Sequence, residues 1–286
     1  LAIIAMVSIL LIIAYFMLVD IQTKIPNQEK YTCKVEAKQF MGRNIFTLTP
    51  QDIEKTNLTI LYFHGGAYMA EATQAHWDFL EKIANDTGAT IIFPDYPLSP
   101  KYSYKDVFRM VVPLYKEVID RISPENLVIM GDSAGGGLSL ALEERLCEDN
   151  IEMPEKTILI SPWLDVRLTN PKIDEVQKFD KQLNKETLKL AGLAYAREDG
   201  IDSYLVNPID GDLSDLRNVI IYTGTYDILN PDVYILEQRA KEQGVEIQIK
   251  EYKEASHIWL IQNEEDEKEL VQKAYRDLVN DLESSN

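Results

Sequence analysis

The chain has 286 residues, of which 45% are hydrophobic, and this suffices for the core of one large α/β domain. Its formal net charge is −18 at pH 7, which argues against a nucleic-acid partner, since such binding depends on Lys and Arg side chains that neutralise phosphates. With only two cysteines (Cys33 and Cys147) and three histidines, the chain is expected to hold neither a disulfide nor a metal site.

The first nineteen residues form an apolar stretch without a charged side chain. As a helix they would span roughly 28 Å, close to the ~30 Å hydrocarbon core of a bilayer. A secretory signal has a shorter apolar region and a small-x-small cleavage site, which Ala14-Tyr15-Phe16 does not provide. We therefore predict an apolar transmembrane helix over residues 1–20, with membrane association through residues 1–19. The sequence does not determine on which side of the membrane the rest of the chain lies. An export signal and secretion are the alternative.

After a short polar connector, short apolar runs alternate with amphipathic helices. A hairpin of antiparallel edge strands is expected from Tyr31–Phe40 and Asn44–Thr49. The further expected strands, mostly continuous apolar runs typical of parallel strands buried on both faces, are Leu58–Phe63, Thr90–Phe93, Leu127–Met130, Thr157–Ile160, Val219–Thr223 and Glu246–Glu251. The expected helices are Ala75–Asp86, Tyr104–Arg121, Gly136–Glu148, Pro231–Gln243 and Glu264–Leu282. This alternation predicts one α/β domain over residues 21–286, with a doubly wound, mostly parallel sheet.

One segment departs from this alternation. Between Trp163 and Asn207 no strand is expected, and the sequence is polar and helical, as in Asn184–Arg197. Because the segment follows a strand of the sheet directly, we expect an insertion near residues 165–206 that covers the end of the sheet as a helical cap.

Ser133 lies in Gly131-Asp132-Ser133-Ala134-Gly135, between an expected strand and a helix that begins near Ala134. In G-x-S-x-G spacing the turn is so tight that the serine takes a strained backbone conformation and its neighbours must lack side chains. The turn lifts the hydroxyl above the carboxyl end of the sheet, where a helix dipole favours negative charge. A glycine-rich turn without catalytic role is the alternative, and the position between strand and helix favours a nucleophile.

A small-residue loop, His64-Gly65-Gly66-Ala67, follows the expected strand that ends at Phe63. Acyl transfer through a tetrahedral intermediate needs preorganised N–H donors directed at an oxyanion. The predicted oxyanion hole therefore comprises Gly65, Gly66, Ala67 and Ala134. The amides of the last three donate, and Gly65 provides flexibility. A phosphate-binding loop is the alternative, but neither G-x-G-x-x-G nor a P-loop lysine is present.

The general base is expected to be a histidine, and chain order selects it. Enzymes with this serine turn place their triad in the order Ser, acid, His. His64 and His76 precede the serine, so only His257 qualifies. Asp227 and Asp165 both follow strands, and we favour Asp227 as the acid because its later strand lies beside the histidine loop. Asp165 is expected to brace the turn before the cap.

Five motifs in this order resemble the hormone-sensitive lipase-like family of carboxylesterases over roughly residues 57 to 262. They are His64-Gly65-Gly66-Ala67-Tyr68, Asp95-Tyr96-Pro97-Leu98-Ser99-Pro100, Gly131-Asp132-Ser133-Ala134-Gly135-Gly136, Ser161-Pro162-Trp163-Leu164-Asp165 and Gly224-x-x-Asp227-x-Leu229. The resemblance implies an α/β-hydrolase fold with a cap, no cofactor, and small-molecule substrates that are short acyl esters. It assigns Ser133, Asp227 and His257 to a catalytic triad.

The chain departs from the family pattern at three positions. Ala67 replaces the third glycine of the oxyanion loop, which is tolerable because only its N–H is needed. Lys101 stands where the family has an acidic residue, and Ile258-Trp259 replaces the common Gly-Phe after the histidine, which narrows the expected acyl pocket.

The sequence thus predicts a serine carboxylesterase that works through an acyl-enzyme intermediate. An amide or N-acyl hydrolase with the same triad, such as a deacetylase or an arylformamidase-like enzyme, is an open alternative. A catalytically inactive binding protein is another. The physiological substrate and the oligomeric state are not predicted.

Overall fold

A computed structural model of the chain describes residues 19–24, 26–51 and 53–284. The predicted anchor over residues 1–20 lies outside these residues, apart from its last two positions. Over the ranges that are described, no helix combines the length and the apolar character needed to cross a bilayer.

The described residues contain one eight-stranded sheet with the strand order β1-β2-β4-β3-β5-β6-β7-β8. β1 and β2 form the predicted hairpin, β2 is also antiparallel to β4, and all other neighbouring strands are parallel. The strand bounds are β1 Lys34–Phe40, β2 Arg43–Thr49, β3 Thr59–Phe63, β4 Thr90–Pro94, β5 Leu127–Asp132, β6 Lys156–Ile160, β7 Val219–Gly224 and β8 Ile247–Tyr252. The mostly parallel α/β sheet predicted from the sequence is confirmed.

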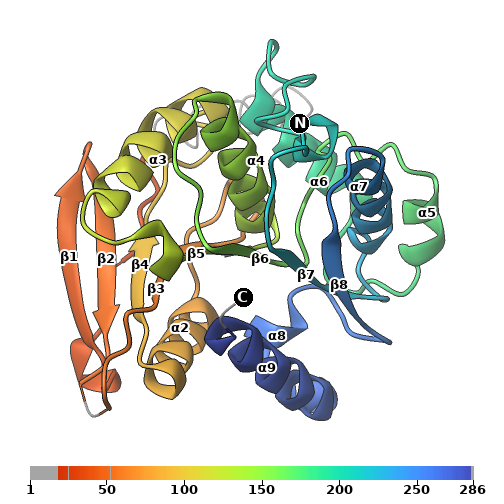
Figure 1. Ribbon diagram of the computed structural model, residues 1–286. Coiled ribbons are helices and arrows are strands. Elements are labelled where there is room, and N and C mark those ends of the chain that lie inside the picture. The colour runs from red at the N-terminus through yellow and green to blue at the C-terminus, as the bar shows by residue number, and fades with distance from the viewer. Residues whose placement is uncertain (1–18, 25, 52, 285–286) are drawn as a thin grey trace, which may run out of the picture.

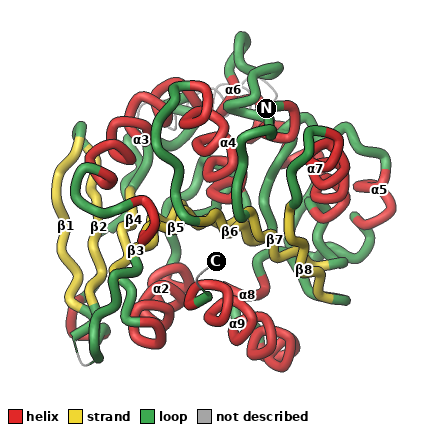
Figure 2. Tube along the Cα trace, in the orientation of Figure 1, coloured by secondary structure: helices red, strands yellow, loops and turns green. Residues whose placement is uncertain are grey.

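Helices cover both faces of this sheet (Figure 1). α3 (Tyr104–Ile119), α4 (Ala134–Glu148) and α7 (Asn230–Glu242) lie on one face, and α2 (Gln74–Thr87), α8 (Trp259–Gln262) and α9 (Lys268–Glu283) lie on the other. In Figure 2 the strands form one twisted band between these two layers. Short 3-10 turns complete the described elements: η1 Gln28–Lys30, η2 Pro124–Asn126, η3 Pro208–Asp210 and η4 Glu265–Glu267.

Local sequence explains where these elements begin and which side chains they bury. Thr73 and Ser103 each precede a helix and form a capping box with the third helical residue, which pairs otherwise unsatisfied N–H groups. β3, β5, β6 and β7 are buried along their whole length, because helices cover both of their faces. In contrast, edge strand β1 is largely exposed and carries alternating polar residues.

Residues 161–218 form the insertion between β6 and β7. This fully described segment contains α5 (Lys172–Val176), α6 (Lys185–Ala196) and no strand. The ring of Tyr195 on α6 stacks on Tyr68, with 3.7 Å between ring centroids and 5° between ring planes. Since Tyr68 belongs to the loop after β3, the insertion packs against the carboxyl end of the sheet.

Candidate active site

Ser133 occupies the turn between β5 and α4, with φ of 51°. A non-glycine residue rarely adopts this conformation, and surrounding contacts must hold it in place. The Ser133 N–H donates to the carbonyl of Ile160 at 2.9 Å. The flanking glycines are required sterically, because a Cβ on Gly131 would lie 2.4 Å from the carbonyl oxygen of Gly135, and one on Gly135 would lie 2.0 Å from that of Phe63.

The structure brings the three side chains of the predicted triad together. His257 Nε2 lies 3.0 Å from the Oγ of Ser133, and His257 Nδ1 lies 2.8 Å from an Oδ of Asp227. They come from three different loops, each at the carboxyl end of a parallel strand: β5, β7 and β8. All three are buried, with exposed fractions of 5% for Ser133, 4% for His257 and 0% for Asp227. This hydrogen-bond chain can transfer the serine proton to the imidazole.

The charges around His257 favour its protonated form. Burial alone lowers the pKa of an imidazole, but the adjacent Asp227 carboxylate, through its charge and its hydrogen bond, outweighs this effect. The carboxylates of Asp180 and Asp132 act in the same direction, and the net result is a pKa of His257 above its ordinary value of 6.5.

Asp165, the other candidate acid, lies in a different environment. Its Oδ1 accepts hydrogen bonds from the backbone N–H and the guanidinium of Arg167, at 2.9 and 2.7 Å. Its Oδ2 accepts from the hydroxyl of Thr169. As expected, Asp165 braces the turn at the base of the insertion.

The loop after β3 presents two of the predicted oxyanion donors. Gly66 and Ala67 have φ of 110° and 53°, a turn that leaves both N–H groups without an acceptor in the described part of the chain. The N–H of Ala134, the first residue of α4, is also unused among the described residues, as is usual in the first turn of a helix. These three amides remain available to a ligand.

Gly65, the member of the predicted oxyanion hole that was expected to provide flexibility, differs from the three predicted donors. Its N–H already donates to Oδ1 of Asp132 at 2.9 Å. Its lack of a side chain has a steric reason, because a Cβ there would lie 2.2 Å from Asp132 Oδ2 and 3.0 Å from the Cβ of Ser133. Gly65 therefore lies at the close contact between the oxyanion loop and the nucleophile turn, and the predicted donors are still Gly66, Ala67 and Ala134.

Asp132, which the sequence marked only as the residue before the nucleophile, connects these loops. Besides Gly65, it accepts a hydrogen bond from the Tyr62 hydroxyl at 2.7 Å and lies 3.3 Å from Nε2 of His76. Burial raises the pKa of Asp132, but His76 and the hydrogen bonds reverse this, and the pKa lies below its ordinary value. His64 is fully buried against Tyr96, and burial lowers its pKa to about 4. These interactions are structural.

Ser161, which directly follows β6, binds the loop that carries His257. The Ile258 N–H donates to the Ser161 Oγ at 3.2 Å. Ile258 has φ of 46°, a left-handed conformation that glycine adopts without strain, and this is where the resembling family commonly has glycine. The side chain of Trp259 is fully buried.

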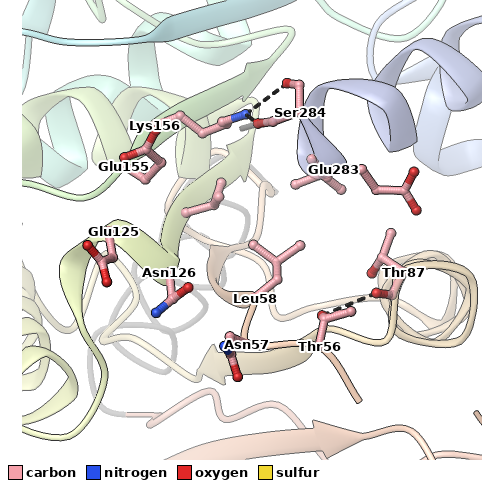
Figure 3. A pocket seen from close by; sticks show the side chains of 12 residues that line it. Thr56, Asn57, Leu58, Thr87, Glu125, Asn126, Glu155, Lys156, Glu283 and Ser284 are labelled. Carbon is pink, nitrogen blue, oxygen red and sulfur yellow. Dashed lines mark hydrogen bonds between the residues drawn. The ribbon is translucent and has the colours of Figure 1, made fainter. Parts of the chain in front are cut away.

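A cavity of about 580 Å³ lies at the opposite edge of the sheet, beside the amino ends of β3, β5 and β6 (Figure 3). There the Nζ of Lys156 donates to the backbone carbonyl and to the hydroxyl of Ser284. Its lining contains neither histidine nor cysteine. Within the described ranges, no group of three or more His, Cys, Asp or Glu residues is arranged to hold a metal ion.

Comparison with known proteins gives a consistent result. A protein-family model described as an alpha/beta hydrolase fold matches residues 60–261. An esterase of Acinetobacter venetianus is 32% identical over 196 residues, which cover 68% of this chain and 64% of that protein. An acetyl-hydrolase of Streptomyces hygroscopicus is 27% identical over 204 residues, covering 70% of this chain and 68% of that protein. A triacylglycerol lipase of Mycobacterium tuberculosis is 28% identical, with 43% of its length covered.

Solved structures share the fold. A hormone-sensitive lipase from a metagenome library superposes with a TM-score of 0.81 at 23% identity, covering 88% of this chain and 87% of that one. An esterase/lipase from an uncultured bacterium superposes with a TM-score of 0.80 at 22% identity, covering 96% of this chain and 91% of that one.

Proposed function

The chain belongs to the α/β-hydrolase fold family and to its hormone-sensitive lipase-like carboxylesterases, and from this membership we propose that it is a serine carboxylesterase. The observation that carries the proposal is the hydrogen-bond chain from Ser133 through His257 to Asp227. The amides of Gly66, Ala67 and Ala134, which have no acceptor among the described residues, support it. The relatives that support it are named esterase, acetyl-hydrolase and lipase.

In the proposed mechanism, Ser133 Oγ attacks the ester carbonyl carbon while its proton moves to Nε2 of His257. Asp227 keeps the imidazole in the tautomer that exposes Nε2 and stabilises the imidazolium. The amides of Gly66, Ala67 and Ala134 bind the oxyanion of the tetrahedral intermediate. When this intermediate collapses, His257 protonates the leaving alcohol and an acyl-enzyme remains.

The same groups then hydrolyse the acyl-enzyme. His257 takes a proton from a water molecule, whose oxygen attacks the acyl carbon, and the second tetrahedral intermediate occupies the same oxyanion hole. Its collapse returns the proton to Ser133 Oγ and releases the carboxylic acid.

Replacing Ser133 with Ala tests the proposal most directly. The variant should hydrolyse p-nitrophenyl butyrate at least about 10³-fold more slowly than the wild type, because no covalent intermediate can form. Ser123→Ala, at the opposite edge of the sheet, serves as the matched control and should keep wild-type turnover. Full activity in Ser133→Ala would refute the assignment.

The preference for short acyl chains is supported by a buried aromatic cluster that adjoins the nucleophile turn. Tyr68, which follows the oxyanion loop, stacks on both Trp163 and Tyr195, and all three side chains are buried. The backbone N–H of Trp163 donates to the Ser133 carbonyl, so this aromatic cluster adjoins the nucleophile turn. In a panel of p-nitrophenyl esters, acetate and butyrate should be hydrolysed faster than octanoate and palmitate, and p-nitroacetanilide would reveal amide hydrolysis.

Two further assignments belong to this proposal. The insertion near residues 165–206 acts as the cap over the substrate. The apolar residues 1–19 attach the enzyme to a membrane, which the absence of charge in that stretch supports. Fractionation of cells that express the chain with and without residues 1–20 tests this attachment, since only the longer protein should sediment with membranes.

A further inference from the structure

The connector between α5 and α6, residues 177–184, is the part of the insertion that contacts the loops that carry the triad. Gln182 Nε2 donates to Ser256 Oγ at 3.2 Å, directly before His257. The ring of Phe179 stacks on Tyr226, directly before Asp227, with centroids 5.0 Å apart and ring planes at 7°. The connector therefore contacts both the acid loop and the histidine loop.

Asp180, at the centre of this connector, binds backbone on both sides. Its Oδ1 accepts hydrogen bonds from the N–H groups of Gln182 and Leu183, at 2.9 and 2.8 Å, which close the connector on itself. Its Oδ2 accepts the N–H of Ile228 at 2.9 Å, in a buried contact. Since Ile228 follows Asp227, Asp180 holds the peptide group next to the triad acid.

This contact has a direct geometric effect on the acid. The carboxylate of Asp227 uses one oxygen to accept the Leu229 N–H, at 2.9 Å, and the other to face His257. The orientation of the acid thus depends on the loop from Asp227 to Leu229, and the only carboxylate from the insertion that binds this loop in the described structure is Asp180.

We propose that Asp180 is a positioning residue for the triad: it orients Asp227 through the Ile228 amide and adds a negative charge that stabilises protonated His257. This inference rests on the proposed esterase function. The titratable groups that face His257 are Asp227 from the loop after β7, Asp180 from the connector and Asp132 from the end of β5. Burial raises the pKa of Asp180, and its three backbone N–H donors oppose this effect.

Asp180→Asn is the sharpest test. The carbonyl oxygen of asparagine can still accept the Gln182 and Leu183 amides, but its NH₂ group then faces the Ile228 N–H, and the charge is lost. Asp165→Asn is the matched control. Asp165 is also a buried carboxylate of the insertion that accepts a backbone N–H, but that N–H belongs to Arg167 and not to a loop that carries a triad residue.

In the hydrolysis of p-nitrophenyl butyrate, kcat of Asp180→Asn should fall about 10- to 100-fold with KM nearly unchanged, as expected for a misplaced catalytic group. The acid limb of its kcat/KM profile should move about half a pH unit lower, because a charge that favours protonated His257 is gone. Asp165→Asn should leave the limb in place. The rate of Ser133 labelling by a fluorophosphonate probe, measured as a function of pH, should show the same acid limb. The midpoint of that limb does not depend on how much of the variant folds.

The outcomes separate the two hypotheses. If Asp180→Asn kept the wild-type kcat and the wild-type acid limb of kcat/KM, the proposed role of Asp180 would be overturned. The same holds if Asp180→Asn and Asp165→Asn changed kcat and the acid limb equally, because that result would indicate a merely structural contact. A wild-type protein that neither turns over esters nor labels at Ser133 would refute the esterase function itself.

Discussion

Glu143 provides a test of the folded state that is independent of the active site. It lies on α4, the helix that begins directly after the nucleophile, and its side chain is fully buried. Burial raises its pKa from the ordinary 4.5 to about 8, and the nearby Thr157 hydroxyl and Arg217 N–H oppose this only in part. Near neutral pH the folded protein therefore holds this group protonated, whereas the unfolded chain ionises it.

The resulting pH dependence has a definite sign. Because the folded pKa is the higher one, the stability from this group is fully present below pH 4.5 and is lost as the pH rises through 8. Between these two values, each unit of increase in pH lowers the free energy of unfolding by about 1.4 kcal/mol. From pH 5.5 to 7.5, the free energy of unfolding falls by about 2.5 kcal/mol when partial titration at both ends is included.

Glu143→Gln removes this titration and keeps the size of the side chain. The free energy of unfolding of the variant relative to wild type should therefore rise by about 2.5 kcal/mol between pH 5.5 and 7.5. Urea unfolding at both pH values, followed by fluorescence and circular dichroism, measures this difference. Ionisable groups that do not interact with Glu143 cancel because both proteins contain them. Glu152→Gln, at an exposed position, should show no such change. An equal difference at both pH values would refute the reasoning.

Two further predictions concern the site. The acid limb of kcat/KM for the wild type should have its midpoint above pH 6.5, because Asp227 raises the pKa of His257 and the imidazole must be neutral to act as base. A pH–rate profile measures this midpoint, and a value below 6.5 would contradict the prediction. Gly65→Ala should lower kcat by at least about 10-fold, because the new Cβ would lie 2.2 Å from Asp132 Oδ2 and displace the oxyanion loop. Gly244→Ala is its control for turnover: the φ of 81° makes the new side chain strain the backbone, but its Cβ meets nothing within 4 Å. Equal kcat in both folded variants would contradict the prediction.

The sequence predicted the architecture because strand and helix patterns are local. The runs that became β3 and β5 to β7 were recognisable as continuous apolar segments, and the ends of each lie within two residues of the prediction. The exceptions follow from the same principle. α5 and α8 are too short to show a helical period, and the last long helix begins at Lys268 rather than Glu264 because a 3-10 turn precedes it.

The sequence also selected the side chains that meet at the carboxyl edge. G-x-S-x-G is a local steric requirement, and a single histidine lies downstream of it, so chain order alone identified Ser133 and His257. The structure places these two within hydrogen-bond distance, and their catalytic roles remain our proposal.

Tertiary structure decided which partners meet across loops. Asp227 and Asp165 both follow strands, and only the fold shows that the first faces His257 while the second binds Arg167. The Gly65 amide is used by Asp132, and Asp180 reaches the acid loop from a segment 47 residues upstream of Asp227 (227 − 180). Periodicity records which face of an element is buried, but not which loops converge at the end of a sheet. That convergence determined which amides remain free for an oxyanion and which carboxylates surround the histidine.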